Sequence, residues 1–378
     1  KHHDGFALWN SKSSEYNVYN YSNPKRDIIK DLSEACKKHG IKLGFYYSHW
    51  TDWDHPYSWD NSKEIYWLDK KKFDIYWQEK VIPQMKELLS NYGEISLIWF
   101  DMWLNHNETI VTKEQLFQLK NLIRKMQPNC LINSRLGLSI EEDKDVDFRT
   151  LGDNQLGEFK YEYPWQTPAT VAHSWGYNVN ENEWKSTTSI LRSLIGNVSL
   201  NGNLMLNIGP TSNGSVPYEI KKRFGEIGNW LSFYGKSIYG SGAFDLRNDI
   251  HDWGLTTYKK SNNGKHYVFL NIFDNQPGET LKFTGILESP SNVYLLDKKS
   301  KTNLNFKFNK AVISVKLPKN LPDPYVNVIE LEFNKKPKID QDLVAESKYG
   351  GYSLKFTNSI SAQGKSLINK AKRFGYRS

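Results

Sequence analysis

A carboxylate directly follows an apolar run in the first third of the chain. Residues 97–100 are Leu-Ile-Trp-Phe, and Asp101 comes next, with Trp99 and Trp103 two residues to either side. An unbroken apolar run is typical of a strand buried on both faces of a parallel sheet. In a barrel of parallel strands, catalytic residues lie at the C-terminal strand ends. Asp101 is therefore a candidate nucleophile; the alternative is that it caps the next helix or ends the strand in a turn.

Further polar and aromatic side chains accompany the neighbouring apolar runs. They are His2, His3, Tyr46, Tyr47, Trp99, Asn133 and Arg135. Hydrolysis of a glycosidic bond needs two carboxyl groups, hydrogen-bonding groups for the sugar hydroxyls and a hydrophobic wall. Each residue also has a plainer interpretation, since a histidine pair alone is more often structural or on the surface than ligand-binding. Their spacing, one strand apart, favours a shared site.

The scaffold that positions these groups is predicted to alternate strands and helices. Apolar runs predict strands at 5–9, 41–48, 97–100, 130–133 and 202–210, and helical spacing predicts helices at 27–39, 75–91, 114–126, 186–195 and 217–234. Strands that alternate with helices indicate βαβ units and a parallel sheet, so the fold class is α/β.

The pattern changes near residue 240. Between 245 and 333 the apolar runs are short, and Asn, Gly and Asp turns separate them without an intervening helix pattern. This is typical of an all-β sandwich. We therefore predict three segments, a catalytic domain at 1–240, a β-sandwich domain at 241–335, and a linker or the start of a further truncated module at 336–378.

The composition is that of an ordinary globular protein with a surplus of aromatic residues. The 378 residues are 14% aromatic, with 13 Trp and 22 Tyr, and such rings suit the apolar face of a sugar. The net charge of +8 comes from dispersed lysines, which argues against a nucleic-acid partner. No apolar run is long enough to span a membrane. The two cysteines, Cys36 and Cys130, make no disulfide framework.

Six motifs occur in an order that resembles the α-L-fucosidases of glycoside hydrolase family 29. They are His2-His3-Asp4-Gly5-Phe6, Gly44-Phe45-Tyr46-Tyr47-Ser48, Leu97-Ile98-Trp99-Phe100-Asp101, Asn133-Ser134-Arg135, Ser174-Trp175-Gly176-Tyr177 and the run 202–210. The resemblance covers residues 1 to about 240. It implies a (β/α)8-like TIM barrel followed by a C-terminal all-β sandwich. Because the motifs start part-way round such a barrel, the sequence is interpreted as N-terminally incomplete or as a barrel without its first strands.

The resemblance also implies an activity and a set of site residues. The activity is retaining, exo-acting hydrolysis of terminal α-linked L-fucose from oligosaccharides or polysaccharides, with Asp101 as nucleophile and no metal or organic cofactor. A secreted or periplasmic location is expected. The residues expected to hold the fucose are His2, His3, Tyr47, Trp99, Arg135 and Trp175, with Tyr46 as the alternative to Tyr47 because adjacent strand residues point to opposite faces.

The general acid/base is expected in the loop that follows the Arg135 strand. Glu158 is the first choice and Glu162 the second. Gln155 and Gln166 stand where an acid could be placed, and an amide cannot donate a proton as a general acid. This leaves two alternatives to the fucosidase: a catalytically degenerate fucose- or carbohydrate-binding protein, and a related barrel glycosidase that acts on sulfated fucans or galactosides.

Overall fold

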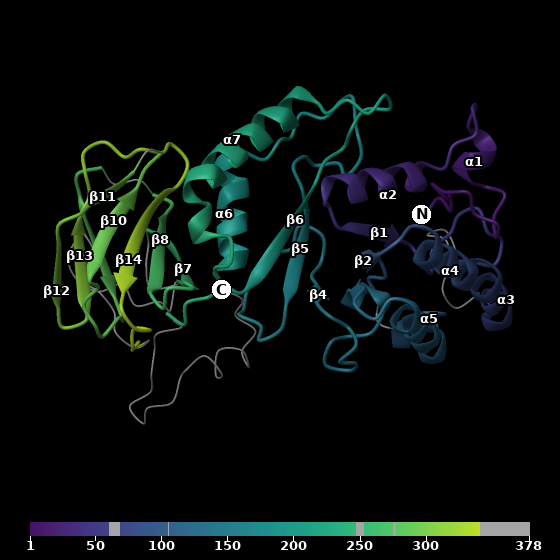
Figure 1. Cartoon of the computed structure of the whole chain (residues 1–378), viewed down its shortest axis with the longest axis horizontal. Helices are drawn as coiled ribbons and strands as arrows, with labels where there is room; N and C mark the ends of the chain where they lie inside the picture. The colour runs from purple at the N-terminus through teal and green to yellow at the C-terminus, as the bar shows by residue number, and fades with distance from the viewer. Residues whose placement is uncertain (60–68, 105, 247–252, 275–276, 299, 341–378) are drawn as a thin grey trace, which may run out of the picture. The chain divides into compact units, whose positions relative to one another are not determined.

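The computed structural model describes residues 1–340 except 60–68, 105, 247–252, 275–276 and 299 (Figure 1). The chain forms two compact units, one of Lys1–Gly152 with Tyr163–Trp165 and one of Asp153–Glu162 with the chain from Gln166 onward. These two units are defined by packing, and the second one groups the helices between residues 187 and 234 with the β-sheet that follows them. The domain bounds 1–240 and 241–335 therefore stay a prediction. Most of the third segment, from 341 on, lies outside the described residues.

A parallel sheet with the order β1-β2-β3 is the centre of the first unit. Its strands are β1 (Leu43–Tyr47), β2 (Ile95–Phe100) and β3 (Leu131–Ile132), and β4 (Arg149–Thr150) follows a parallel bridge between Asn133 and Phe148. The helices are α1 (Val18–Tyr21), α2 (Ile28–His39), α3 (Lys70–Tyr76), the π-helix η2 (Trp77–Val81), α4 (Ile82–Asn91), η3 (His106–Glu108), α5 (Lys113–Met126) and η4 (Ser134–Leu136).

Local sequence signals set the ends of the two best-predicted helices. Asp27 caps α2 by accepting from Lys30 N, and Gly40 ends the helix in the left-handed conformation. In α5, Thr112 and Gln115 form a capping box. The predictions 27–39 and 114–126 are therefore confirmed to within a residue.

Two local predictions for the first unit need correction. Residues 5–9 do not form a strand, because only Ala7 pairs, in an isolated bridge with Asn17. The helix predicted from 75 begins earlier, at Lys70, and passes through the π-turn Trp77–Val81 just before Pro83. Pro83 lacks the backbone N–H that would continue the i to i−4 hydrogen bonds of an α-helix. The π-turn therefore lies where these hydrogen bonds are interrupted.

The described part of the second unit contains two β-sheets that pack together, the helices α6 and α7, and the strands β5 and β6, which belong to neither of these two sheets. Its elements are β5 (Trp165–Thr170), α6 (Thr187–Val198), β6 (Gly202–Asn207), α7 (Tyr218–Tyr234), η5 (Gly235–Ser237), β7 (Gly254–Lys260), β8 (His266–Ile272), β9 (Thr280–Thr284), β10 (Asn292–Leu296), β11 (Lys301–Asn303), β12 (Phe306–Asn309), β13 (Val312–Lys316) and β14 (Asn327–Phe333). Antiparallel pairs build a five-stranded sheet, β11-β10-β14-β8-β7, and a three-stranded sheet, β12-β13-β9.

The strand β14 shows why these layers belong together, since all seven of its residues are buried. One face of the five-stranded sheet packs with the three-stranded sheet around Ile313, Val315 and Ile329. Its other face packs on α6 and α7, where Trp230 Nε1 donates to Val326 O. The all-β segment predicted between 245 and 333 is confirmed for its described residues.

Candidate active site

Asp101 directly follows the last residue of β2, at the C-terminal edge of the parallel sheet. Its side chain is 15% exposed. The indole N–H of Trp50 donates to the Asp101 carbonyl at 3.0 Å, and Met102 N donates to Arg135 O at 2.8 Å. These bonds hold the peptide group that joins Asp101 to Met102. The strand-end placement expected from the sequence is therefore observed.

Both oxygens of the Asp101 carboxylate accept strong hydrogen bonds. Arg135 Nη1 lies 2.6 Å from Oδ1, and the Tyr46 hydroxyl donates to Oδ2 at 2.6 Å. His3 Nε2 lies 3.6 Å from Oδ2. Arg135 comes from η4 just after β3, while Tyr46 lies in β1 opposite Trp99. Three predicted site residues from different segments therefore surround one carboxylate.

The structure places Tyr46 beside Asp101 and turns Tyr47 away. Tyr47 is fully buried, and its hydroxyl donates to Gln84 Oε1 at 2.8 Å. Burial raises the Tyr47 pKa well above its usual value. Successive strand residues point to opposite faces, so only one of the two tyrosines can face the site. The tyrosine named as the alternative is the one that contacts the carboxylate.

The two histidines lie side by side next to Tyr46. The His2 ring centroid is 4.3 Å from that of His3 and 5.1 Å from that of Tyr46. Burial lowers the pKa of both imidazoles, and for His3, with the neighbouring His2 as a further cause, to about 4. Both rings are therefore neutral near pH 7 and can donate from one nitrogen and accept at the other.

Trp99 supplies an aromatic wall and an unused donor. Its ring stacks on Tyr46 at 5.5 Å, and the Arg135 guanidinium lies 5.2 Å from the ring centroid. The Trp99 indole N–H is buried and has no hydrogen-bond partner among the described residues. Because an unpaired buried donor is costly, this N–H is a candidate to bind a ligand.

A metal ion is a second chemistry to test against this cluster. One ligand atom from each of His2, His3 and Asp101 lies within 4.8 Å of the others. Arg135 already pairs with the Asp101 carboxylate at 2.6 Å, and its positive guanidinium opposes a cation at the same group. The group fits a polar sugar pocket better than a metal centre.

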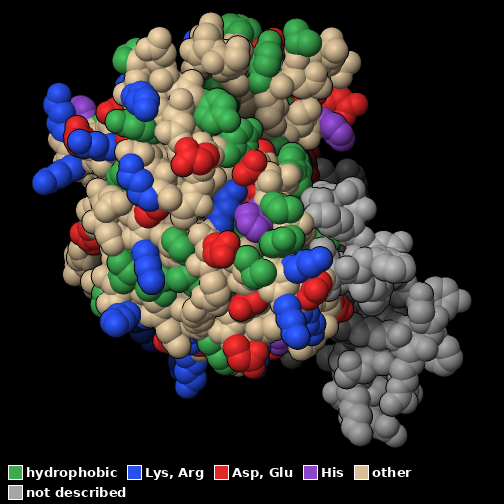
Figure 2. Space-filling model, turned by 90° about the vertical axis from the view of Figure 1, so that its right-hand side faces the viewer, with side chains coloured by type: hydrophobic (Ala, Val, Ile, Leu, Met, Phe, Trp, Pro, Cys, Tyr) green, Lys and Arg blue, Asp and Glu red, His purple; other side chains and the backbone are tan. Residues whose placement is uncertain are grey.

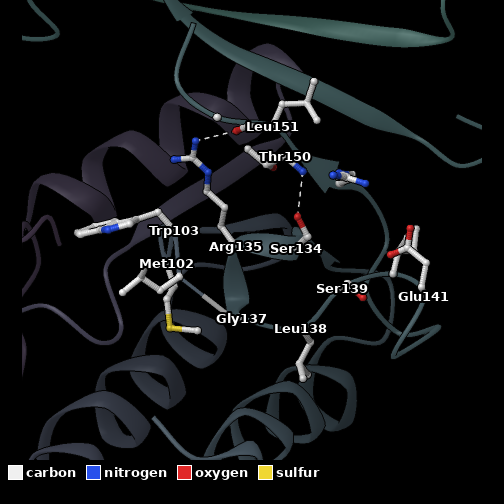
Figure 3. A pocket seen from close by; sticks show the side chains of 14 residues that line it. Met102, Trp103, Ser134, Arg135, Gly137, Leu138, Ser139, Glu141, Thr150 and Leu151 are labelled. Atoms are coloured by element: carbon white, nitrogen blue, oxygen red, sulfur yellow. Dashed lines mark hydrogen bonds between the residues drawn. The ribbon is translucent and has the colours of Figure 1, made fainter. Parts of the chain in front are cut away.

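A pocket of about 360 Å³ lies between the segments that follow β2, β3 and β4 (Figure 3). Trp103 and Arg135 line it and also contact the Asp101 cluster, since the Trp103 ring lies 5.8 Å from that of His3. Glu141 and Arg149 lie in its wall, and the Tyr163 hydroxyl donates to Glu141 at 2.6 Å. The pocket therefore adjoins the carboxylate and contains both an exposed indole and polar groups.

The other predicted site residues belong to the second unit. Trp175 is 37% exposed, and Asn207 Nδ2 donates to its carbonyl at 2.7 Å. Glu158 is exposed. The Glu162 side chain is 85% exposed and forms an ion pair with Lys160 at 3.3 Å. None of these facts assigns a catalytic role, so the roles stay predictions.

Asp153 is a carboxylate that our sequence reasoning passed over. It comes three residues after β4 and two after Leu151, whose carbonyl accepts from Arg135 Nη2 at 2.7 Å. The rule that selected Asp101, a carboxylate just beyond a strand, would also have selected Asp153. The signal was missed because β4 is only two residues long and its sequence does not read as a strand.

Charges of both signs are interspersed on the face shown in Figure 2, and no basic stripe is seen on the described part of that face. Among the described residues, no helix is long and apolar enough to cross a membrane.

Comparison with known proteins identifies the family. A family model described as Alpha-L-fucosidase matches residues 1–236. The α-L-fucosidase of Dictyostelium discoideum is 28% identical over 351 residues, covering 88% of this chain and 72% of the relative. The solved α-L-fucosidase isoenzyme 1 of Paenibacillus thiaminolyticus is 30% identical with a TM-score of 0.73, covering 88% of this chain and 81% of that one. An α-L-fucosidase of Lactobacillus casei, solved with α-L-fucose, is 37% identical with a TM-score of 0.51, covering 59% and 70%.

The chain spans 62% of the length of a putative α-L-fucosidase from Caenorhabditis elegans and 52% of the human plasma α-L-fucosidase. The predicted fold class, a TIM-like barrel followed by a C-terminal β-domain, is confirmed by these likenesses. The chain belongs to the α-L-fucosidase family of glycoside hydrolases.

Proposed function

We propose that this protein is a retaining exo-α-L-fucosidase that removes terminal α-linked L-fucose from glycans. The observation that carries the proposal is the Asp101 carboxylate, oriented by Arg135 and Tyr46 beside the neutral imidazole of His3. A retaining glycosidase needs such a fixed carboxylate as its nucleophile. A secreted or periplasmic location, where fucosylated glycans are met, is part of the proposal.

The reaction proceeds in two displacements. In the first, an Asp101 oxygen forms a bond to the anomeric carbon while the glycosidic C–O bond breaks and a general acid protonates the leaving oxygen. In the second displacement, the residue that acted as general acid now acts as general base. It takes a proton from water as the water oxygen attacks the anomeric carbon and releases Asp101. Arg135 and Tyr46 keep the carboxylate oriented in both steps.

Neutral groups around Asp101 bind the fucose. His2 and His3 exchange hydrogen bonds with its hydroxyls, and the buried Trp99 N–H donates to one of them. Trp175 is proposed to pack on the apolar side of the sugar. The indole wall of Trp99 lowers the local dielectric and strengthens the effect of the carboxylate on the developing positive charge.

Glu158 remains our first choice for the general acid. A retaining pair stands roughly 5–5.5 Å apart, so the acid must come from a segment that reaches the strand ends. Glu162 is less suited, because its side chain is 85% exposed and pairs with Lys160 at 3.3 Å. Asp153 is added as a rival, because it follows β4 within two residues of the Arg135 contact.

The pocket beside Arg135 is proposed to hold the leaving group. The Trp103 ring, 48% exposed, offers a flat surface to a second sugar, and Glu141 and Arg149 offer polar contacts. This arrangement would favour saccharide leaving groups over small ones.

A fucose-binding protein without catalysis is the second candidate, favoured by Gln155 and Gln166. Hydrolysis of an aryl α-L-fucoside separates the two, because an activated leaving group needs little acid assistance. We expect turnover by the unaltered protein and almost none by Asp101→Asn. Fucose binding without turnover of the aryl fucoside would favour the binding protein.

A further inference from the structure

We propose that Ser48, with the buried ion pair of Asp52 and Lys80 behind it, holds His3 as the Nδ1–H tautomer so that its Nε2 accepts a hydrogen bond from a sugar hydroxyl. Ser48 is then a positioning residue that acts through His3. The identity of the ligand rests on the proposed function, whereas the tautomer itself does not.

The hydrogen bonds of Ser48 assign the proton on the imidazole. The Ser48 hydroxyl donates to Thr51 O at 2.9 Å, and its oxygen lies 2.8 Å from His3 Nδ1. A hydroxyl has a single hydrogen. Since that hydrogen is committed to Thr51, Nδ1 must be the donor in the second bond. The hydrogen bond at one ring nitrogen thus determines the state of the other.

The remaining nitrogen of His3 is therefore available as an acceptor. Nε2 lies 3.6 Å from Asp101 Oδ2, which is beyond hydrogen-bond distance. Burial and the neighbouring His2 lower the His3 pKa to about 4, so the ring carries no second proton near neutral pH. A sugar hydroxyl can donate to Nε2 and, in turn, accept from another group of the site.

A buried ion network fixes the backbone that carries Ser48. Lys80 Nζ lies 2.8 Å from Asp52 Oδ2, and Lys1 Nζ lies 3.1 Å from the same atom. Burial favours the neutral form of Asp52, but the two lysines outweigh it and lower the Asp52 pKa. Lys1 Nζ also donates to the carbonyls of Ser48 and Thr51. Lys1, held by the Asp52 carboxylate, thus ties the backbone of Ser48 to that of Thr51.

The same network reaches the main chain of His3. Trp53 N, next to Asp52, donates to His3 O at 2.7 Å. Gly5 has a φ of 83°, and a Cβ there would lie 2.2 Å from Asp52 Oδ1. The segment that carries His3 can therefore pass this close to the Asp52 carboxylate only with a glycine at position 5. Lys80, 3% exposed, extends from the π-turn Trp77–Val81, a local geometry that is frequent at functional sites.

The tautomer can be measured directly on the whole protein by NMR of ¹⁵N-histidine. We expect His3 to give shifts of the Nδ1–H form with unprotonated Nε2 at pH 7. In Ser48→Ala we expect mixed tautomers and fucose binding about 2- to 13-fold weaker, the loss typical of one hydrogen bond. Ser48→Thr, which keeps the hydroxyl, should restore both. Ser237→Ala is the control, since Ser237 is fully buried and donates to Tyr234 O at 2.9 Å.

A second pair of variants tests the ion network. Lys80→Met should raise KM for an aryl α-L-fucoside about 10-fold with a smaller change in kcat, and Lys80→Arg should recover part of the loss. Lys120→Met is the matched control, because Lys120 is 7% exposed and pairs with Asp143 and Asp145, just as Lys80 pairs with Asp52 and Asp54. An equal KM effect in both methionine variants would overturn the role of the network.

The tautomer measurement remains decisive even where a variant does not fold. An Nε2–H form of His3 in the unaltered protein overturns the proposal. An Nδ1–H form in a protein that neither binds nor hydrolyses fucosides supports the assignment of the proton and instead refutes the proposed function.

Discussion

Replacing Tyr46 or Tyr47 by phenylalanine should have opposite consequences for activity and stability. Tyr46→Phe removes the 2.6 Å hydrogen bond to Asp101 Oδ2. A hydrogen bond to a charged group contributes about 1.5–3 kcal/mol, which corresponds to roughly 10- to 150-fold in rate. Because His3 Nε2, 3.6 Å from Oδ2, is too far away to replace that bond, the carboxylate loses its orientation and kcat/KM should fall by that factor. The free energy of unfolding should change little.

Tyr47→Phe should leave activity within about two-fold but lower the free energy of unfolding by about 1–3 kcal/mol, because Gln84 Oε1 stays buried without its donor. The measurements are hydrolysis of an aryl α-L-fucoside and unfolding in urea, both at pH 7. The reasoning is refuted if Tyr47→Phe loses activity while Tyr46→Phe keeps it, since that would place Tyr47 on the site face of β1.

Three more predictions concern the leaving group, the acid and pH. Trp103→Ala should lower kcat/KM for a fucosylated disaccharide about 10-fold but not for α-L-fucosyl fluoride, whose leaving group is too small to reach the pocket; equal losses would exclude a leaving-group site there. The general acid should be one of Glu158, Glu162 and Asp153. In the alanine variant that lacks it, azide should restore turnover of an activated fucoside and give a fucosyl azide of retained configuration. If azide rescues none of the three variants, the acid lies elsewhere. Burial lowers the His49 pKa from 6.5 to about 3, so the unfolded state binds more protons between these values. The contribution of His49 to the free energy of unfolding should therefore fall by roughly 1.4 kcal/mol per pH unit between pH 6.5 and about 3. Urea unfolding of His49→Phe should show a slope that is smaller by this amount, while His2 and His3, whose pKa values are also lowered, still contribute.

The sequence was sufficient to predict that several of the residues around Asp101 lie together, because this prediction depends only on the order of strands and helices. Asp101, Arg135 and His3 meet since each lies at or beyond the C-terminal edge of the parallel sheet or in the segment beside it. The choice between Tyr46 and Tyr47 could not be made in this way. It depends on the pairing register of β1 with β2, and a shift of one residue would exchange the two faces.

Features set by tertiary contacts were also beyond the sequence. Lysine side chains are usually exposed, yet the structure buries Lys80 against Asp52. The local sequence pattern does not indicate a partner 28 positions earlier. Residues 5–9 have the apolar content of a strand, but only Ala7 pairs. Local propensity is a weak guide where long-range pairing decides.

The covalent intermediate tests the central claim most directly. With 2-deoxy-2-fluoro-α-L-fucosyl fluoride, the fucosyl-enzyme should form and then hydrolyse slowly. The 2-fluoro group destabilises the positive charge of both transition states, but fluoride is a good leaving group, so the first step still proceeds. Intact-protein and peptide mass spectrometry should show one added fluorofucosyl group, on Asp101. A label on another carboxylate, or turnover of the reagent by Asp101→Asn with the rate of the unaltered protein, would contradict the assignment of Asp101 as the nucleophile.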